Sequence, residues 1–307
     1  MSQRIGVMDL GTNTFHLLIA EIDGGSFRIV HRDRKPVKLG KGGINQRTIR
    51  PDAIERAVAC MKDFRIRLNE EKVARFRALG TSALRDAANG EEVITAIRRH
   101  SGIEVEVISG QQEAEYIYYG VRSAVPLGDA PCLIVDIGGG SVEFIIADQS
   151  TIHWKTSLDI GAQRLLEQFH RHDPITPDEV AALDQHYAAA LSLLEGPMNQ
   201  WRPRVLVGSS GTFDTLSEIH CAAAGIPYPV QQTETPLTVD SCRAIHQKLI
   251  SKNRAERMQI PGMIEMRVDM IVVASCLINY LLNRYNFSDV RVSTYSLKEG
   301  VLVALQA

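Results

Sequence analysis

The chain contains one sequence pattern twice, and this repeat constrains its fold more than any other feature. Residues 9–20 read DLGTNTFHLLIA and residues 136–147 read DIGGGSVEFIIA, an offset of 136 − 9 = 127 residues. In each copy an apolar run leads into an aspartate and a turn of small residues, and a second apolar run follows, which predicts strand, turn and strand. Because the offset is close to the length of a typical domain, we expect two lobes.

The segments around each copy predict a similar order of elements. In the first half we expect strands at 5–9, 16–22, 27–32, 76–80 and 105–108, a turn at 23–25, and helices at 52–69 and 91–100. In the second half we expect strands at 133–136, 143–147, 152–157 and 204–208, helices within 162–194, and a buried core helix at 270–282. Meander strands followed by alternating helices and strands predict an α/β fold with mixed sheets. The expected lobes are 1–121 and 122–307 with a ligand crevice between them, and a C-terminal helix over 296–307 could pack back on the first.

Charge and cysteine content limit the partners and the compartment. The chain has 34 Lys+Arg and 36 Asp+Glu, a net charge of −2, so no strong field attracts DNA or an anionic membrane. We interpret the basic run at 32–41 as a solvated strand and loop. The five cysteines are odd in number and scattered, and the apolar run at 270–282 is too short to span a bilayer. We therefore expect a cytoplasmic protein with no DNA partner and no membrane partner.

The two repeated turns are the first candidate site. One comprises Gly11, Thr12, Asn13 and Thr14, and the other comprises Gly138, Gly139, Gly140 and Ser141. Such turns can present backbone N–H groups and hydroxyls to an anion without a side chain blocking its approach, and the preceding aspartate can hold a cation. Either turn alone could be an ordinary hairpin turn, but the duplication favours a shared role. Two turns that faced each other would grip a polyphosphate.

Two charged residues between the copies are further candidates. Arg85 follows a strand end, where a guanidinium could fork onto phosphate oxygens; alternatively it is a surface residue paired with Asp86 or Glu91. Ser109 and the glutamine three residues later form a capping box, which predicts that a helix begins there. Glu113 then lies in the first turn, where its carboxylate could deprotonate a water, or where it merely complements the helix dipole.

Five segments resemble, in order, the exopolyphosphatase / guanosine pentaphosphate phosphohydrolase (Ppx/GppA) family. They are DLGTNTFHLLIAEI, GTSALRDAAN, ISGQQEAEYIYYGV, VDIGGGSVEFII and SLKEGVL, and the match runs from Ile5 to Leu302. The resemblance implies an actin-like fold of two RNase H-like lobes. It also implies a Mg²⁺-dependent hydrolase that releases terminal phosphate from inorganic polyphosphate, the 5′-phosphate from pppGpp, or both.

The resemblance also implies roles for acidic residues. Glu113 falls where the family has the glutamate that activates the attacking water. Asp136 and Glu143 resemble its magnesium-linked acidic pair, which makes Glu143 a catalytic candidate as well, and Asp9 is the first-lobe counterpart of Asp136. Because His16 stands where the second copy has Glu143, we expect the metal nearer Asp136 than Asp9.

The remaining matches and departures bear on the substrate. Arg85 matches the family's phosphate-contacting arginine, and the two turns match its phosphate loops. Glu115 replaces an arginine of the family pattern, which bears on the substrate length preference or the rate. The turn at 208–212 reads GSSGT where the family has GGT, which makes guanosine recognition the weaker part of the assignment. Longer members carry a helical extension that lengthens the phosphate-binding channel. The 307 residues do not include it, so we expect short polyphosphate chains as substrates. A homodimer is one way to rebuild the channel.

Two other functions remain open on the sequence. One is a non-catalytic sensor that binds pppGpp or polyphosphate and signals by lobe closure, and Glu115 and Ser210 are the features that favour it. The other is an actin-like ATPase or small-molecule kinase. Glu113, which suits water activation, and the absence of a large insert for an acceptor site both weigh against the kinase.

Overall fold

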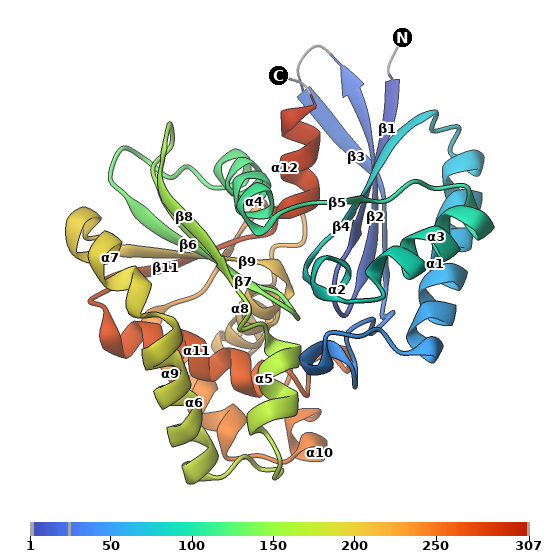
Figure 1. Ribbon diagram of the computed structural model, residues 1–307. Coiled ribbons are helices and arrows are strands. Elements are labelled where there is room, and N and C mark those ends of the chain that lie inside the picture. Colours follow the sequence, from blue (N-terminus) through green and yellow to red (C-terminus); the bar gives the residue numbers. More distant parts are fainter. Residues whose placement is uncertain (1–2, 24–25, 306–307) are drawn as a thin grey trace. The chain divides into compact units, whose positions relative to one another are not determined.

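The chain forms two units, each built around its own mixed sheet. The computed structural model describes residues 3–23 and 26–305, so residues 24 and 25 of the expected turn at 23–25 lie outside the described residues. The first unit comprises residues 1–120 and 297–307, and the second comprises residues 121–296. Figure 1 shows the elements coloured along the chain. The expected α/β class with mixed sheets is confirmed.

The first unit has a five-stranded sheet with the order β3-β2-β1-β4-β5. Its strands are β1 (Gln3–Leu10), β2 (Phe15–Asp23), β3 (Ser26–Lys35), β4 (Arg75–Gly80) and β5 (Glu106–Val107). The first three strands are antiparallel neighbours, whereas β4 runs parallel to β1 and β5 runs parallel to β4. The four expected strands from 5 to 80 are confirmed. The strand expected at 105–108 is shorter, because only two residues of it pair with β4.

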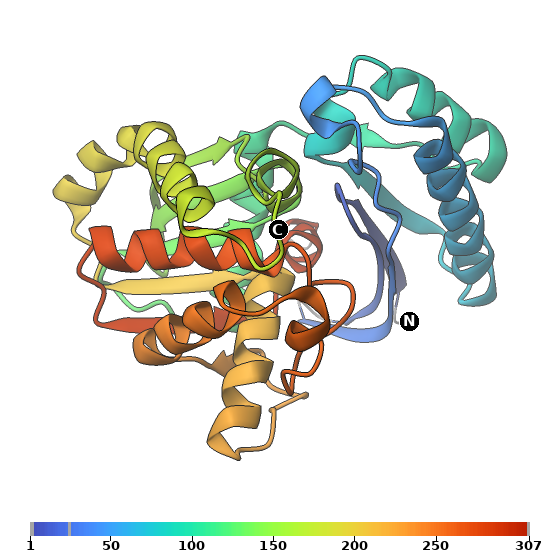
Figure 2. The same ribbon diagram turned by 90° about the horizontal axis from the view of Figure 1, so that it is seen from below.

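Helices cover both faces of this sheet. They are α1 (Pro51–Glu70), α2 (Ser82–Asp86), α3 (Gly90–Ser101), α4 (Gly110–Ala124) and α12 (Leu297–Ala304), with a 3-10 turn η1 (Ile44–Gln46). Pro51 starts α1, where its missing N–H is not needed. The helix then buries Ala57, Met61, Phe64 and Leu68, spaced at three or four residues, against the sheet. Helices α1 and α3 pack together on one face, and α12 packs against β1 and β2 on the other (Figures 1 and 2).

The second unit repeats this sheet with one added strand. Its order is β10-β11-β9-β6-β7-β8. The strands are β6 (Cys132–Ile137), β7 (Val142–Ala147), β8 (Ile152–Leu158), β9 (Val205–Ser209), β10 (Glu234–Pro236) and β11 (Asp289–Ser293). Strands β6, β9 and β11 are parallel, and the others pair antiparallel. The central strands β6 and β7 are buried along their whole length, as their continuous apolar sequences require.

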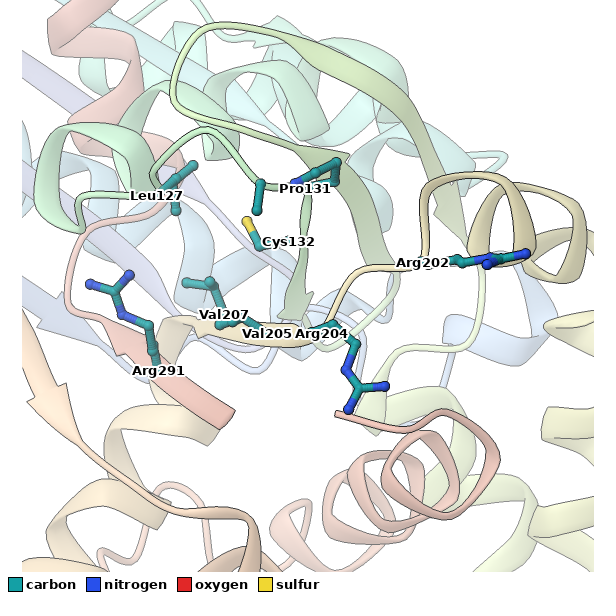
Figure 3. A pocket seen from close by; sticks show the side chains of 9 residues that line it. Leu127, Pro131, Cys132, Arg202, Arg204, Val205, Val207 and Arg291 are labelled. Carbon is teal, nitrogen blue, oxygen red and sulfur yellow. The ribbon is translucent and has the colours of Figure 1, made fainter. Parts of the chain in front are cut away.

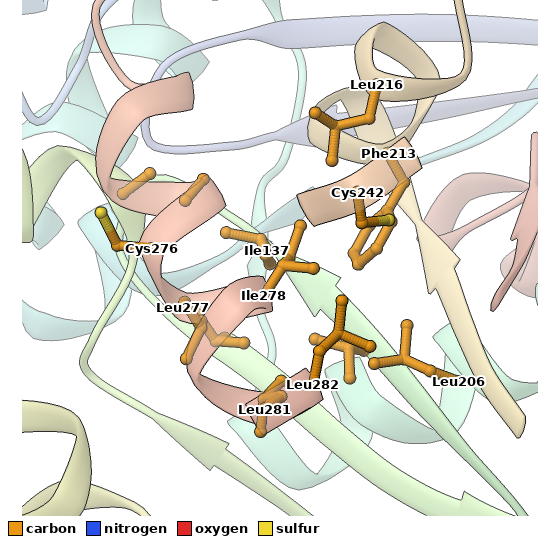
Figure 4. Packing of buried hydrophobic residues seen from close by; sticks show 14 of the residues in the cluster. Ile137, Leu206, Phe213, Leu216, Cys242, Cys276, Leu277, Ile278, Leu281 and Leu282 are labelled. Atoms are coloured by element: carbon orange, nitrogen blue, oxygen red, sulfur yellow. The ribbon is translucent and has the colours of Figure 1, made fainter. Parts of the chain in front are cut away.

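The second unit also holds a large helical core. Its helices are α5 (Ala162–Phe169), α6 (Pro177–Ala190), α7 (Glu195–Trp201), α8 (Ser210–Ala224), α9 (Val239–Ile250), α10 (Arg254–Arg257) and α11 (Ile271–Arg284), with a 3-10 turn η2 (Ser192–Leu194). Figure 4 shows Ile278 of α11 packed near Ile137 of β6 and Phe213 of α8, all of them buried. The expected core helix at 270–282 is thus confirmed as α11. In the part of the chain that the structure describes, no helix is long and apolar enough to cross a membrane.

Candidate functional site

A row of polar side chains crosses the sheet of the second unit. Asp136 on β6 pairs directly with Glu143 on β7 and, on its other side, with Ser209 on β9. The row continues to Ser157 on β8, opposite Glu143, and to Ser293 on β11, opposite Ser209. Residues that lie directly opposite each other in a sheet point to the same face. Five strands therefore place one polar residue each along a single line, which we call the polar row.

The two carboxylates of this row are buried and held by serine hydroxyls. Asp136 is 5% exposed and Glu143 is 1% exposed. The hydroxyls of Ser209 and Ser296 each donate to Oδ2 of Asp136 over 2.6 Å, and Ser157 Oγ donates to Oε1 of Glu143 over 2.7 Å. Like charges directly opposite in a sheet repel, and burial of charge is costly unless it is compensated. A cation bound beside the pair would reduce this repulsion.

The donor set of the polar row fits Mg²⁺. Its charged atoms are carboxylate oxygens, and Mg²⁺ in phosphoryl-transfer sites is bound by one or two carboxylates together with substrate phosphates and water. Within residues 3–23 and 26–305, no three His, Cys, Asp or Glu side chains are placed to enclose a metal ion. The two carboxylates of the polar row would supply part of the coordination of Mg²⁺, and phosphate oxygens and water would supply the rest.

The second repeated turn follows β6 and is clamped by the start of α5. Gly138 N donates to Ser141 O over 3.0 Å and closes the turn. The backbone N–H groups of residues 161–163 donate to the carbonyls of residues 138–140 over 2.8 to 3.2 Å. Arg164, which is 7% exposed, adds a bond from Nε to Gly140 O at 2.8 Å.

This clamp sets the direction of the backbone N–H groups. In a trans peptide the C=O and the following N–H point in opposite directions. Because the carbonyls of residues 138–140 point to α5, the N–H groups of residues 139–141 point away from it, and they have no hydrogen-bond partner among the described residues. Consecutive amides of this kind form an anion-binding concavity. The backbones of Gly161 and the turn lie so close that a Cβ on Gly161 would be 2.4 Å from the carbonyl carbon of Gly140.

The first repeated turn is clamped in a similar way by a different segment. Gly11 N donates to Thr14 O over 3.2 Å. The carbonyls of Thr12 and Asn13 accept bonds from the backbone N–H groups of Gly40 (2.9 Å) and Lys38 (2.8 Å). In the first unit an irregular segment after β3 therefore does what the start of α5 does in the second.

The residues beside this first turn differ from the polar row. Asp9 on β1 pairs directly with His16 on β2, and His16 pairs with Arg34 on β3. Basic side chains thus stand where the second unit has Glu143 and Ser157. Among the residues that the structure describes, two carboxylates in adjacent register occur in the second unit and not in the first.

Arg85 and Glu113 form an ion pair within the first unit. Arg85 Nη1 donates to Glu113 Oε2 over 2.9 Å and to the carbonyl of Ile108 over 3.2 Å, and Arg85 Nε lies 3.6 Å from Asp86 Oδ1. The two side chains are 20% and 10% exposed. The expected capping box is confirmed. Ser109 N donates to the side chain of the glutamine three residues later, and the backbone N–H of that glutamine donates to Ser109 Oγ. The cap begins α4, so Glu113 lies in its first turn and 8% of it is exposed.

Several residues of these clusters carry no motif that would reveal them. Ser209 and Ser157 join the carboxylates only through strand register, and Ser296 joins them from 160 positions along the chain. Arg164 supports the second turn from the neighbouring helix. One weak signal was available: Ser209 ends an apolar run at 205–208 much as Asp136 ends the run at 132–135.

A cavity of about 140 Å³ in the second unit lies away from this cluster (Figure 3). Its lining includes Cys132 and Val205, which begin β6 and β9, whereas the polar row lies near the other ends of those strands. Arg291 also lines it, but its guanidinium is held by both carboxylate oxygens of Glu234 at 2.7 Å. The lining offers no carboxylate pair and no amide turn.

Comparison with known proteins gives the family. Residues 18–306 match the model of the Ppx/GppA phosphatase family. The crystal structure of an exopolyphosphatase from Cytophaga hutchinsonii is 44% identical and has a TM-score of 0.96, with 99% of this chain and 98% of that chain covered. The Ppx/GppA family member from Aquifex aeolicus is 27% identical with a TM-score of 0.82, covering 99% and 98%. A Haemophilus influenzae protein named as a candidate exopolyphosphatase is 28% identical over 99% of this chain and 92% of its own. The chain belongs to the Ppx/GppA phosphatase family.

Proposed function

We propose that this protein is a Mg²⁺-dependent phosphoanhydride hydrolase that releases the terminal phosphate of inorganic polyphosphate. The observation that carries the proposal is the buried Asp136–Glu143 pair next to the turn at 138–141, whose N–H groups at 139–141 point away from α5. This combination offers a cation site and an anion site in adjacent residues. Family membership and the exopolyphosphatase names of two relatives support the same activity.

Phosphoanhydride cleavage needs positioning and charge stabilisation more than covalent chemistry. The amides of the second turn would hold phosphate oxygens, and Gly11, Thr12, Asn13 and Thr14 of the first turn would do the same. Asp136 and Glu143 would hold Mg²⁺. Asp9, the counterpart of Asp136 in the first repeat, is a further candidate ligand. When bound, Mg²⁺ would neutralise charge that develops on the phosphoryl oxygens.

Glu113 is the proposed general base. Its carboxylate would orient a water in line with the scissile bond and accept its proton. The 2.9 Å contact with Arg85 supports this role, because the guanidinium compensates the carboxylate charge in a buried place. A guanidinium has several donors in one plane, so Arg85 could keep its hydrogen bond to Glu113 while another of its N–H groups binds a phosphate oxygen.

The 5′-phosphate of pppGpp is the second candidate substrate. Superfamily analogy places a nucleoside near the turn at 208–212, and there Arg267 packs closely on Gly211, since a Cβ on that glycine would lie 2.0 Å from Arg267 Nη2. Side-chain atoms thus already occupy space beside this turn. We therefore place polyphosphate ahead of pppGpp. A cytoplasmic homodimer also remains part of the proposal.

The decisive experiment is phosphate release with Mg²⁺ from tripolyphosphate, long-chain polyphosphate and pppGpp, comparing wild type with Glu113→Gln. We expect the variant to lose about 10²-fold or more in kcat, because general-base catalysis contributes on that order. Equal rates in both proteins would refute the role of Glu113. Tight binding without turnover would favour a sensor, and ATP-dependent phosphorylation of a metabolite without phosphate release would favour a kinase.

A further inference from the structure

The segment that clamps the first turn is strongly basic. Residues 34–50 comprise the last two residues of β3 and its connection to α1, and they contain six cations and no acid. We call them the basic segment. The cations are Arg34, Lys35, Lys38, Lys41, Arg47 and Arg50. A charge run of this kind is often only a solvated loop. Here, however, the same residues form hydrogen bonds to a candidate phosphate loop.

The contact between the basic segment and the first turn is close and conformationally demanding. Lys38 N donates to Asn13 O over 2.8 Å while Lys38 adopts φ 53°, in the left-handed region that a lysine rarely occupies. Gly40 lies so near the turn that a Cβ on it would be 2.5 Å from Thr12 Cγ2. Strained backbone of this kind persists where the surrounding structure fixes it, and it gathers at functional sites.

Four cations of the basic segment, Arg34, Lys38, Lys41 and Arg47, have no acidic partner among the described residues. Arg47 donates from Nε to the carbonyl of Asp86, and Arg50 lies 3.8 Å from an oxygen of Asp52. The side chains of Lys38 and Lys41 are exposed, and neither has an acidic or hydrogen-bonding partner among the described residues. Lys38 bonds through its backbone to Asn13, and Lys41 follows Gly40, which bonds to Thr12, so both lysines belong to the stretch that contacts the first turn.

We propose that Lys38 and Lys41 bind the non-reacting phosphates of the substrate and so set its preferred chain length. The inference rests on the proposed function, in which the turns hold the terminal phosphates. The rest of a polyphosphate chain carries charge at every unit, and lysine is a compact point charge on a flexible stem that can follow such a chain. The basic segment contains no aromatic residue on which a base could stack. Its chemistry therefore fits a linear polyanion and not a nucleoside.

The test compares wild type with the double variant Lys38→Gln, Lys41→Gln on tripolyphosphate and on long-chain polyphosphate, at several salt concentrations. We expect KM for the long chain to rise on the order of tenfold, while KM for tripolyphosphate changes less than twofold and kcat is unchanged. The slope of log KM against log salt for the long chain should decrease by about 1.4, since each lost phosphate contact removes about 0.7. Lys62→Gln, an exposed lysine on α1, is the matched control and should behave as wild type.

Restoring charge with Lys38→Arg, Lys41→Arg should recover most of the affinity for the long chain. An equal rise in KM for both substrates, or none for either, would overturn the inference. Calorimetric binding of both polyphosphates separates this result from the proposed function. Binding of the long chain that depends on the two lysines, without any hydrolysis, would support the inference and refute the hydrolase. If the protein hydrolyses polyphosphate and the double variant keeps the wild-type length preference, the hydrolase is supported and the inference about the two lysines is refuted.

Discussion

At the residue scale, the facing carboxylates of Asp136 and Glu143 are the feature with the clearest physical consequence. Their side chains share one face of the sheet, and both are buried. Serine hydroxyls satisfy some of their oxygens but contribute no positive charge. Two carboxylates that face each other in a buried place repel, and a bound cation would reduce that repulsion, which is a common arrangement at functional sites.

Glu143→Gln tests this account through stability as well as activity. The amide keeps an acceptor for Ser157 and removes one negative charge from the pair. In EDTA we expect the variant to melt at or above the wild-type temperature, because the repulsion is gone. Mg²⁺ should raise the melting temperature of wild type but not of the variant, since only an ion that binds the native state stabilises it. Ser157→Ala is the control, and a variant that still responds to Mg²⁺ as wild type does would exclude Glu143 as a ligand.

Sequence reasoning reached these two residues but not their partners, for a physical reason. Asp136 and Glu143 are seven positions apart in one hairpin, so a local pattern can identify both. Ser209 is 73 positions from Asp136 and Ser296 is 160. The role of Ser209 depends on how distant strands align, and a one-residue slip of register would turn its side chain to the other face. Ser296 lies beyond the end of β11, so its contact depends on how the chain continues after that strand.

At the element scale, the short start of α5 determines what the second turn can bind. The helix supplies the donors for the carbonyls of residues 138–140, and so it orients the amides that follow. Gly161 allows the two backbones to approach this closely. In the first unit the same task falls to the basic segment, which is irregular.

Gly161→Ala and Gly196→Ala form a matched pair that tests this packing. A methyl group on Gly161 would meet the backbone of residues 139 and 140 at 2.4 to 2.5 Å, whereas one on Gly196 in α7 would meet no atom within 4 Å. We expect Gly161→Ala to lower the free energy of unfolding by about 2 kcal/mol or more and to raise KM. Gly196→Ala should raise that free energy by about 0.5–1 kcal/mol through helix propensity. Denaturant titration and phosphate release measure both. Similar effects of the two substitutions would contradict the close packing at Gly161.

Elements with strong local patterns were predictable, and those that depend on distant partners were not. Strands β1, β2, β6 and β7 lie close to their expected positions because apolar runs bounded by turns define them. Strand β11 was not expected, since its sequence DVRVS is short and half polar and becomes a strand only by pairing with β9. Helix α2 has only five residues, too few for a periodic pattern.

At the scale of the whole molecule, the repeat in the sequence corresponds to a repeat in topology. The order β3-β2-β1-β4-β5 of the first sheet returns in the second as β8-β7-β6-β9-β11, with β10 added at the edge. The two units nevertheless differ in chemistry. The second contains the facing carboxylates, and it also holds three histidines whose pKa burial lowers, His170, His186 and His246.

The buried histidines predict that acid destabilises the second unit between pH 6.5 and pH 4. Burial lowers the pKa of His246 from 6.5 to about 4. The hydroxyl of Ser275 donates to Val272 O, so it accepts from Nδ1 of a neutral His246 (3.0 Å). Below pH 6.5 the imidazole of His246 is protonated in the unfolded chain but stays neutral in the native state. The free energy of unfolding therefore decreases with falling pH until the native imidazole is protonated near pH 4.

His246 should account for a loss of about 3 kcal/mol in the free energy of unfolding between pH 6.5 and pH 4. His246→Gln removes the titration, so the variant should lose less stability than wild type between pH 6.5 and pH 4, even if it is somewhat less stable at pH 7. The control is His100→Gln on the exposed face of α3, which should follow the wild-type curve. Urea titrations at half-unit steps of pH measure both slopes. Identical pH dependence in wild type and His246→Gln would show that His246 is protonated in the native state as readily as in the unfolded chain. That result would contradict the prediction that burial between α9 and α11 lowers its pKa.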